Sequence, residues 1–115
     1  MRSETATLAP YVPRALLARA ARPIDVLSET VDCTMVFADV SGFTRLSERL
    51  ARRGSEGAEQ LVDLINACFS ALLAEAYDRG GSLVKFGGDA MLLLFYDQQG
   101  DQHHAVRACS AAAAM

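Results

Sequence analysis

The chain of 115 residues contains no tryptophan and only one lysine. Its net charge is −3, with 51% hydrophobic and 22% charged residues. A basic surface for DNA or RNA is therefore not expected, and the hydrophobic share argues against disorder. No apolar run approaches the roughly 20 residues needed to cross a bilayer, and the first ten residues hold no signal-peptide core. We expect a cytoplasmic protein that binds no nucleic acid and has no membrane span in this chain.

The cysteines and histidines offer no disulfide or metal-binding pattern. Cys33, Cys68 and Cys109 are odd in number, far apart and set among apolar residues, without a Cys-x-x-Cys or Cys/His spacing. This usage predicts reduced thiols in the core. His103 and His104 are adjacent, and neighbouring side chains on a helix point about 100° apart, which makes a poor chelate. We expect them to be a solvated pair.

Hydrophobic spacing predicts alternating strands and helices after a flexible lead over residues 1–10. The predicted elements are a helix from Tyr11 to Ala21, a strand from Cys33 to Asp39, a helix after Thr44, a long helix over Leu61–Ala76, a hairpin of Ser82–Phe86 and Ala90–Phe95, and a helix over His103–Met115. The continuous apolar run Met35–Ala38 predicts a strand that is buried on both faces. This order is typical of an α+β fold with an antiparallel sheet and helices on one face, as in ferredoxin-like βαββαβ folds, here incomplete.

Two aspartates, each at the edge of an apolar strand, are the main candidates for chemistry. Asp39 ends the first strand and Asp89 follows a Gly-Gly turn in the hairpin. Removing an unpaired carboxylate from water costs on the order of several kcal/mol. Two carboxylates brought together also repel each other. A divalent cation between them removes both costs and binds a triphosphate. The pair therefore predicts a two-metal phosphate site.

The segment after Asp39 has two interpretations. Ser41 and Gly42 form a turn that leads into a helix, where free backbone N–H groups favour phosphate. The alternative is that Asp39 and Ser41 only cap the helix. Likewise, Gly-Gly-Asp89 can be an ordinary hairpin turn with an exposed acid. The conjunction of both aspartates and both glycine turns around a long amphipathic helix favours the phosphate site.

The sequence resembles the catalytic domain of class III adenylate and guanylate cyclases. The resemblance rests on two motifs, Val36–Thr44 (VFADVSGFT) and Lys85–Met91 (KFGGDAM), and extends from about Thr34 to Ala105. Gly57–Asn66 (GAEQLVDLIN) is most similar to the branch that includes soluble, bicarbonate-responsive cyclases and their bacterial relatives. The resemblance implies a lead with a short helix over residues 1–30 and the first part of a cyclase domain over residues 31–115.

The resemblance also implies a role for each motif residue. Asp39 and Asp89 would be catalytic residues that bind two Mg²⁺ or Mn²⁺ ions, and the carbonyl of Val40 would add a ligand. Lys85 matches the base-recognition position, where adenine users carry lysine and guanine users glutamate, so ATP is expected rather than GTP. A plain surface lysine, an ion pair with Asp89 and a regulatory anion site are the alternatives for Lys85. The phosphate-binding turn would consist of Ser41, Gly42, Phe43 and Thr44.

The resemblance leaves part of the family's site unassigned. The second base-contacting residue and the Asn and Arg that stabilise the transition state have no counterpart before Met115, so we expect a metal half-site. A second cyclase domain, in a homodimer or pseudo-heterodimer, would complete it. One rival interpretation is a degenerate regulatory half that pairs with an active partner. The other is a GGDEF-type diguanylate cyclase, which predicts an acidic residue and phenylalanine where this chain has Ala90-Met91.

Overall fold

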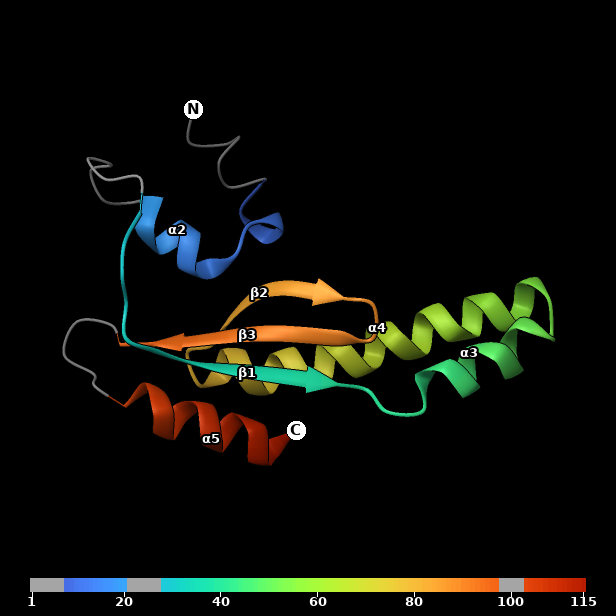
Figure 1. The fold of residues 1–115 in the computed structure, drawn as a ribbon. Coiled ribbons are helices and arrows are strands. Elements are labelled where there is room, and N and C mark those ends of the chain that lie inside the picture. The colour runs from blue at the N-terminus through green and yellow to red at the C-terminus, as the bar shows by residue number, and fades with distance from the viewer. Residues whose placement is uncertain (1–7, 21–27, 98–102) are drawn as a thin grey trace.

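The computed structural model describes residues 8–20, 28–97 and 103–115. It forms a three-stranded sheet with two helices on one face and a helical hairpin that projects beyond one end (Figure 1). The elements are the 3₁₀ turn η1 (Ala9–Tyr11), α2 (Arg14–Ala20), β1 (Cys33–Asp39), α3 (Phe43–Ala51), α4 (Ser55–Asp78), β2 (Ser82–Gly87), β3 (Ala90–Tyr96) and α5 (His104–Ala114).

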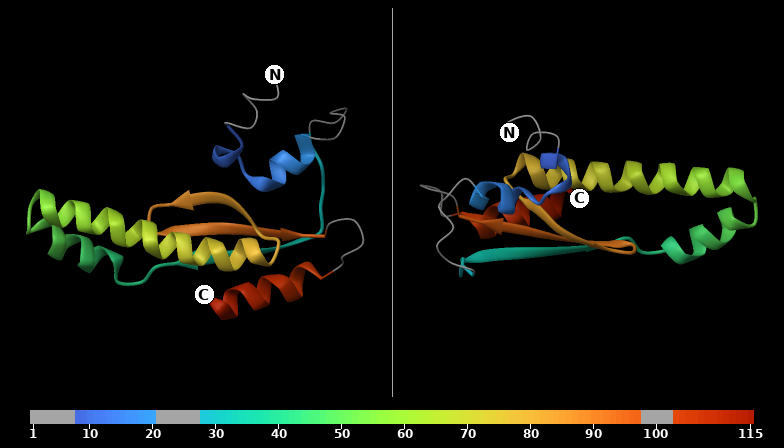
Figure 2. Two further views of the ribbon diagram at one scale, coloured as in Figure 1. Left: turned by 180° about the vertical axis from the view of Figure 1, so that it is seen from behind. Right: turned by 90° about the horizontal axis from the view of Figure 1, so that it is seen from above.

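The sheet has the strand order β1-β3-β2, and both strand pairs are antiparallel. Its outer edges are therefore formed by β1 and β2 in the part of the chain that the structure describes. Helices α4 and α5 cover one face, as the two further views show (Figure 2). This confirms the α+β class, the antiparallel sheet and the placement of helices on one face. No helix in the described ranges combines the length and apolar character needed to cross a membrane.

The core lies between β3 and these two helices. Met91, Leu93 and Phe95 alternate along β3 and are fully buried. Ala76 of α4 and Ala108 and Ala111 of α5 are the buried helical residues of the same cluster. Alanines at these positions let the helices approach the sheet closely, so the large side chains of β3 fill the interior.

Strand β1 corrects one prediction. Its side chains alternate, with Val36 packed against the core while Met35 and Phe37 are 53% and 69% exposed. The expectation of burial on both faces is wrong, because helices cover only one side of the sheet. The opposite face of β1, which we call the open face, carries large apolar side chains that no described element covers.

The predicted secondary structure is largely confirmed. The strand Cys33–Asp39 has the predicted bounds, and the hairpin extends one residue further at the end of each strand. The long helix begins at Ser55, six residues before the predicted start, because its first turn is polar and carries no hydrophobic signal. Within the predicted lead, Ala9 begins a short 3₁₀ turn. The helix predicted from Tyr11 to Ala21 is α2 over Arg14–Ala20, and Ala21 lies outside the described residues.

Helix α5 is tied to the sheet by a polar network, which corrects the prediction for one histidine. His104 is half-buried; its Nδ1 lies 2.8 Å from the hydroxyl of Thr34, and its backbone N–H donates to Asp97. Arg107 donates to the carbonyl oxygens of Arg79 and Tyr96 at 3.1 and 2.8 Å. His103 is exposed, as predicted. The network joins α5 to β1, to the end of β3 and to the end of α4.

The cysteine prediction is half right. All three thiols are free, as expected. Cys33 and Cys68 are half-buried, whereas Cys109 lies exposed on α5 and is not a core residue. Ala108 and Ala111 form the buried stripe of α5, and Cys109 lies off that stripe, so apolar neighbours in the sequence do not imply its burial.

Candidate functional site

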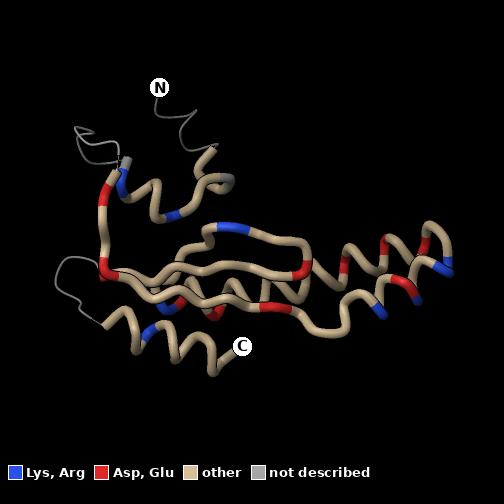
Figure 3. Tube along the Cα trace, viewed as in Figure 1, with Lys and Arg blue, Asp and Glu red and all other residues tan. Residues whose placement is uncertain are grey.

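The two aspartates meet at one end of the sheet. Asp39 is the last residue of β1 and pairs with Ala90, the first residue of β3. The backbone N–H of Val40 donates to the carbonyl oxygen of Asp89 at 3.0 Å. Asp39 and Asp89 therefore lie on neighbouring rungs of one ladder, and Figure 3 shows acidic positions at the end of β1 and at the β2–β3 turn. Fifty residues of sequence separate them, but the sheet brings them together.

Asp39 belongs to the open face of the sheet. Side chains alternate along a strand, so Asp39 shares a face with the exposed Phe37. Phe37 pairs with Leu92 of β3, and Leu92 pairs with Lys85 of β2. Because residues directly opposite in a sheet point to the same side, this row runs across the open face next to the row of Asp39 and Ala90. Lys85 is thus on the same face as Asp39, one row away.

An irregularity in β2 sets the side on which Lys85 lies. Ser82 and Leu83 pair regularly with β3, and the register then shifts by one residue before Lys85. In a regular strand Leu83 and Lys85 would share a face, because side chains alternate with a period of two. The shift lets Leu83 pack against the core while Lys85 stays on the open face.

The turn after β1 leads into α3 without a side-chain cap. Gly42 is the N-cap of α3, with φ +81° and no capping hydrogen bond from a side chain. Asp39 and Ser41 therefore do not cap this helix, which removes the structural alternative. Ser41 and Thr44 are exposed. The first N–H groups of α3 lack intrahelical partners and, with the positive end of the helix, suit a phosphate.

The turn before Asp89 needs glycine. Gly88 has φ +64°, a left-handed conformation that side chains with a Cβ adopt only with strain. The residue that follows, Asp89, is half-buried at the tip of the hairpin. The Gly87-Gly88 pair therefore makes the tight reversal that places Asp89 beside Val40.

None of the charged candidates has an ionic partner within the described residues. Neither Asp39 nor Asp89 takes part in an ion pair there, and Lys85 also forms none, so the proposed pair between Lys85 and Asp89 is absent from that part of the chain. The same ranges contain no cluster of three or more Asp, Glu, His or Cys that could hold a metal. A cation at this end of the sheet would have the two aspartates as its side-chain ligands. Hard carboxylate oxygens with open positions for water and phosphate suit Mg²⁺ or Mn²⁺.

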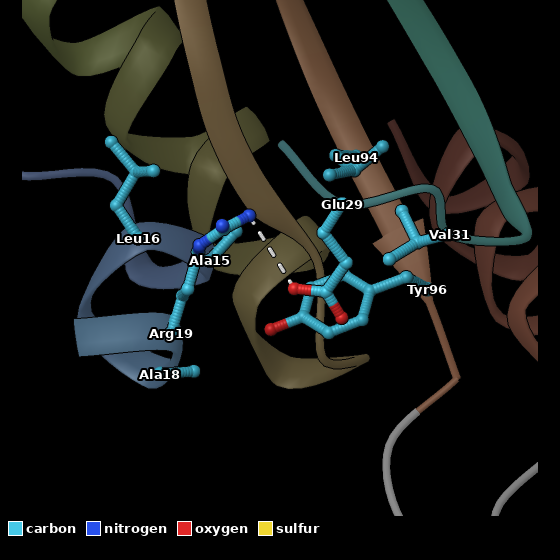
Figure 4. A pocket seen from close by; sticks show the side chains of 8 residues that line it. All are labelled: Ala15, Leu16, Ala18, Arg19, Glu29, Val31, Leu94 and Tyr96. Carbon is cyan, nitrogen blue, oxygen red and sulfur yellow. Dashed lines mark ion pairs between the residues drawn. The ribbon is translucent and has the colours of Figure 1, made fainter. Parts of the chain in front are cut away.

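A cavity lies at the end of the sheet opposite to Asp39 and Asp89, and none of the predicted site residues lines it. It has a volume of about 160 Å³ and lies between α2 and the last residues of β3 (Figure 4). An ion pair between Arg19 and Glu29, with N and O 3.4 Å apart, lies across it. The candidate site is therefore distinct from this cavity.

Sequence reasoning missed two contributors. Phe37 was read as a core residue within an apolar run, whereas it is 69% exposed beside the candidate site. Gly57, in the first turn of α4, is buried against α3. The sequence gives no sign that Phe37 is exposed, because the run Met35–Ala38 is apolar throughout and shows no polar alternation. Gly57 begins the segment Gly57–Asn66 that carries part of the resemblance, but its close approach to the backbone of α3 is visible only in three dimensions.

Comparisons with known proteins identify the family of this chain. The family model described as the adenylate and guanylate cyclase catalytic domain matches residues 26–115. Adenylate cyclase type 10 from rat and from human is 41% identical over 66 residues, which is 56% of this chain and 4% of each relative. The chain thus spans a small part of the length of these relatives. The match favours a cyclase over the GGDEF-type interpretation. The chain therefore belongs to the adenylate and guanylate cyclase catalytic domain family.

Proposed function

We propose that this chain provides the metal half-site of an adenylate cyclase, which converts ATP to cyclic AMP and pyrophosphate. One observation carries the proposal: Asp39 and Asp89 lie on neighbouring rungs of the sheet, without ionic partners among the described residues, beside a helix start that lacks a side-chain cap. The family match and the relatives named adenylate cyclase support it.

Each site residue has a distinct task in this proposal. Asp39, Asp89 and the carbonyl of Val40 hold two Mg²⁺ or Mn²⁺ ions. When bound, such ions lower the pKa of the ribose 3′-hydroxyl and neutralise charge on the triphosphate. The backbone of the turn positions the β- and γ-phosphates through the free N–H groups of α3. The residues of that turn are Ser41, Gly42, Phe43 and Thr44.

Lys85 would recognise the base. It lies on the open face one row from Asp39, which is the side on which a nucleotide held by the aspartates would extend. An ammonium donates hydrogen bonds and accepts none, so it suits the acceptor nitrogen atoms of adenine. ATP is therefore the proposed substrate, with GTP as the competitor to be tested.

A second cyclase domain would complete the site across the open face. Met35 and Phe37 expose large apolar side chains there, next to the charged residues. Exposed apolar groups clustered beside charged candidates are typical of an interaction surface. The partner, in a homodimer or pseudo-heterodimer, would supply groups that stabilise the transition state.

The finer fold is part of the same proposal. The order β1-β3-β2 is that of three strands of a ferredoxin-like βαββαβ fold, with the outer edge of β1 unpaired in the described residues. Helix α5, which follows β3 in the chain, packs along β1. A fourth strand would pair with β1 and remove the free edge, which otherwise invites association. Residues 31–115 would then be the first part of the catalytic domain.

The direct test is product analysis with the complete protein. Incubation with ATP and Mn²⁺ is expected to yield cyclic AMP and pyrophosphate in equal amounts, with slower turnover of GTP. Absence of any cyclic nucleotide with either substrate would reject the proposal. Stimulation of a separate active cyclase domain by an otherwise inactive protein would identify a regulatory half, and cyclic di-GMP from GTP would identify a diguanylate cyclase.

A further inference from the structure

Helix α3 begins within the proposed phosphate-binding turn, Ser41–Thr44, which we call the phosphate turn. The two ends of this helix have different surroundings. It packs mainly along α4, beyond the end of the sheet (Figures 1 and 2). Its last turn lies directly against the start of α4, whereas its first turn borders a cavity. Because the phosphate turn leads into α3, the packing at the two ends of this helix bears on the position of the turn.

The contact between the last turn of α3 and the start of α4 depends on Gly57. A Cβ built on Gly57 would lie 1.8 Å from the carbonyl oxygen of Leu50 and 3.0 Å from the Cβ of Arg53. An ordinary contact needs about 3.5 Å, so the backbones of α3 and α4 would have to separate by more than an ångström to admit a methyl group. Only glycine permits this contact. The corner between α3 and α4, residues 52–54, is short and is closed by hydrogen bonds from Arg53 to Leu50 and from Gly54 to Ala51.

The first turn of α3 borders a cavity. A wholly apolar cavity of about 250 Å³ lies between the phosphate turn and the middle of α4. Val40 and Phe43 line it at the turn, Leu46 lines it on α3, and Cys68 lines it on α4. The cavity is partly open, and side chains that line it have fewer packing neighbours on that side. The N-cap, Gly42, adds no side-chain hydrogen bond.

We infer that α3 pivots about the contact between Gly57 and Leu50, and that Gly57 is a positioning residue for the phosphate turn. The helix has nine residues and is therefore about 13 Å long, so a small change of angle at its last turn is carried to its first. The cavity provides the space for that movement. Gly57 acts through α3 and touches no substrate. The inference rests on the proposed function for its meaning, but the mobility of α3 can be measured without catalysis.

Hydrogen exchange offers a matched comparison within the chain. The first bonded amide of α3 is that of Leu46, which donates to Gly42 at 3.1 Å; the first bonded amide of α4 is that of Ala58, which donates to Gly54 at 3.1 Å. Both helices have a glycine N-cap without a side-chain cap. In the complete protein without nucleotide, Leu46 is expected to exchange at least tenfold faster than Ala58. Equal rates would overturn the pivot.

Substitution tests the positioning role. Gly57→Ala is expected to raise the KM for ATP at least tenfold while kcat changes less than threefold, because a displaced turn weakens triphosphate binding. Glu59→Ala, at an exposed position in the same helix, is the control and should match wild type. A Gly57→Ala protein with wild-type KM would refute the assignment of Gly57.

A second variant covers the case in which Gly57→Ala does not fold. Cys68→Met adds atoms to the cavity and is expected to slow exchange at Leu46 at least fivefold while Ala58 is unchanged. No slowing at Leu46 would overturn the inference. If the wild-type protein forms no cyclic nucleotide, the proposed function fails, whereas the exchange comparison still decides the pivot.

Discussion

The backbone N–H of Val40 donates a hydrogen bond to the carbonyl oxygen of Asp89 across 3.0 Å. This bond extends the pairing of β1 and β3 by one rung and fixes the hairpin tip beside the end of the first strand. The backbones of Asp39, at the end of β1, and Asp89, in the β2–β3 turn, are therefore held side by side. A turn that is hydrogen-bonded to a neighbouring strand is a firmer support for a proposed metal site than a free loop.

Substitution of Lys85 tests base recognition. Lys85→Glu replaces a donor on the open face with an acceptor, so kcat/KM for ATP should fall at least tenfold and the preference should move toward GTP. Steady-state assays with both nucleotides measure the ratio. Arg52→Glu makes the same change of charge at an exposed position on the α3–α4 corner and serves as the control. An unchanged ratio in Lys85→Glu would remove Lys85 from the base site.

Glycine substitutions at the two ends of β2 test the packing of the core. A Cβ on Gly81 would lie 2.6 Å from the ring of the fully buried Phe95, whereas one on Gly87 meets nothing within 4 Å. Gly81→Ala should lower the free energy of unfolding by about 2 kcal/mol, because a packed ring has little room to move. Gly87→Ala is the matched control and should change it by less than about 0.5 kcal/mol. Denaturant titration of both variants gives the comparison. Equal stabilities would contradict the claim that the ring of Phe95 is tightly packed against Gly81.

The contact between Thr34 and His104 should couple α5 to β1. The hydroxyl and Nδ1 are 2.8 Å apart and part-buried. Thr34→Val and His104→Ala should each destabilise the protein by about 1 kcal/mol, and the double variant by clearly less than their sum. Thermal or denaturant unfolding of the four proteins completes the cycle. Strict additivity would mean that the two groups do not interact.

Residues 1–115 expressed alone should self-associate. The outer edge of β1 is unpaired in the described residues, and the open face exposes Phe37 at 69%. Free strand edges and apolar patches promote pairing between chains. Gel filtration is expected to show oligomers or aggregates, which Phe37→Ser should reduce. A monodisperse monomer would contradict this account of the open face.

The sequence predicts the elements well because hydrophobic spacing and glycine turns are local signals. The bounds of β1 and the course of the hairpin both follow from such signals. The sequence predicted that Asp39 and Asp89 belong to one site, and the observed register places their backbones on neighbouring rungs. Ligation of metal by these residues remains a prediction.

What the sequence could not supply depends on the third dimension. The apolar run in β1 suggested burial on both faces, but Phe37 is exposed because helices cover only one side. The face of Lys85 follows from a register shift in β2 that leaves no mark in the residue pattern. The role of Gly57 needs the position of Leu50, and the burial of His104 needs the position of Thr34.

Metal binding by the two aspartates tests the central claim most directly. Titration of Mn²⁺ into the complete protein with a non-reacting ATP analogue, followed by electron paramagnetic resonance, counts bound ions without turnover. Asp39→Asn and Asp89→Asn should each weaken Mn²⁺ binding at least tenfold, whereas Asp78→Asn, an exposed acid at the end of α4, should bind as wild type does. If both asparagine variants bind Mn²⁺ with wild-type affinity and stoichiometry, the account of this site is contradicted.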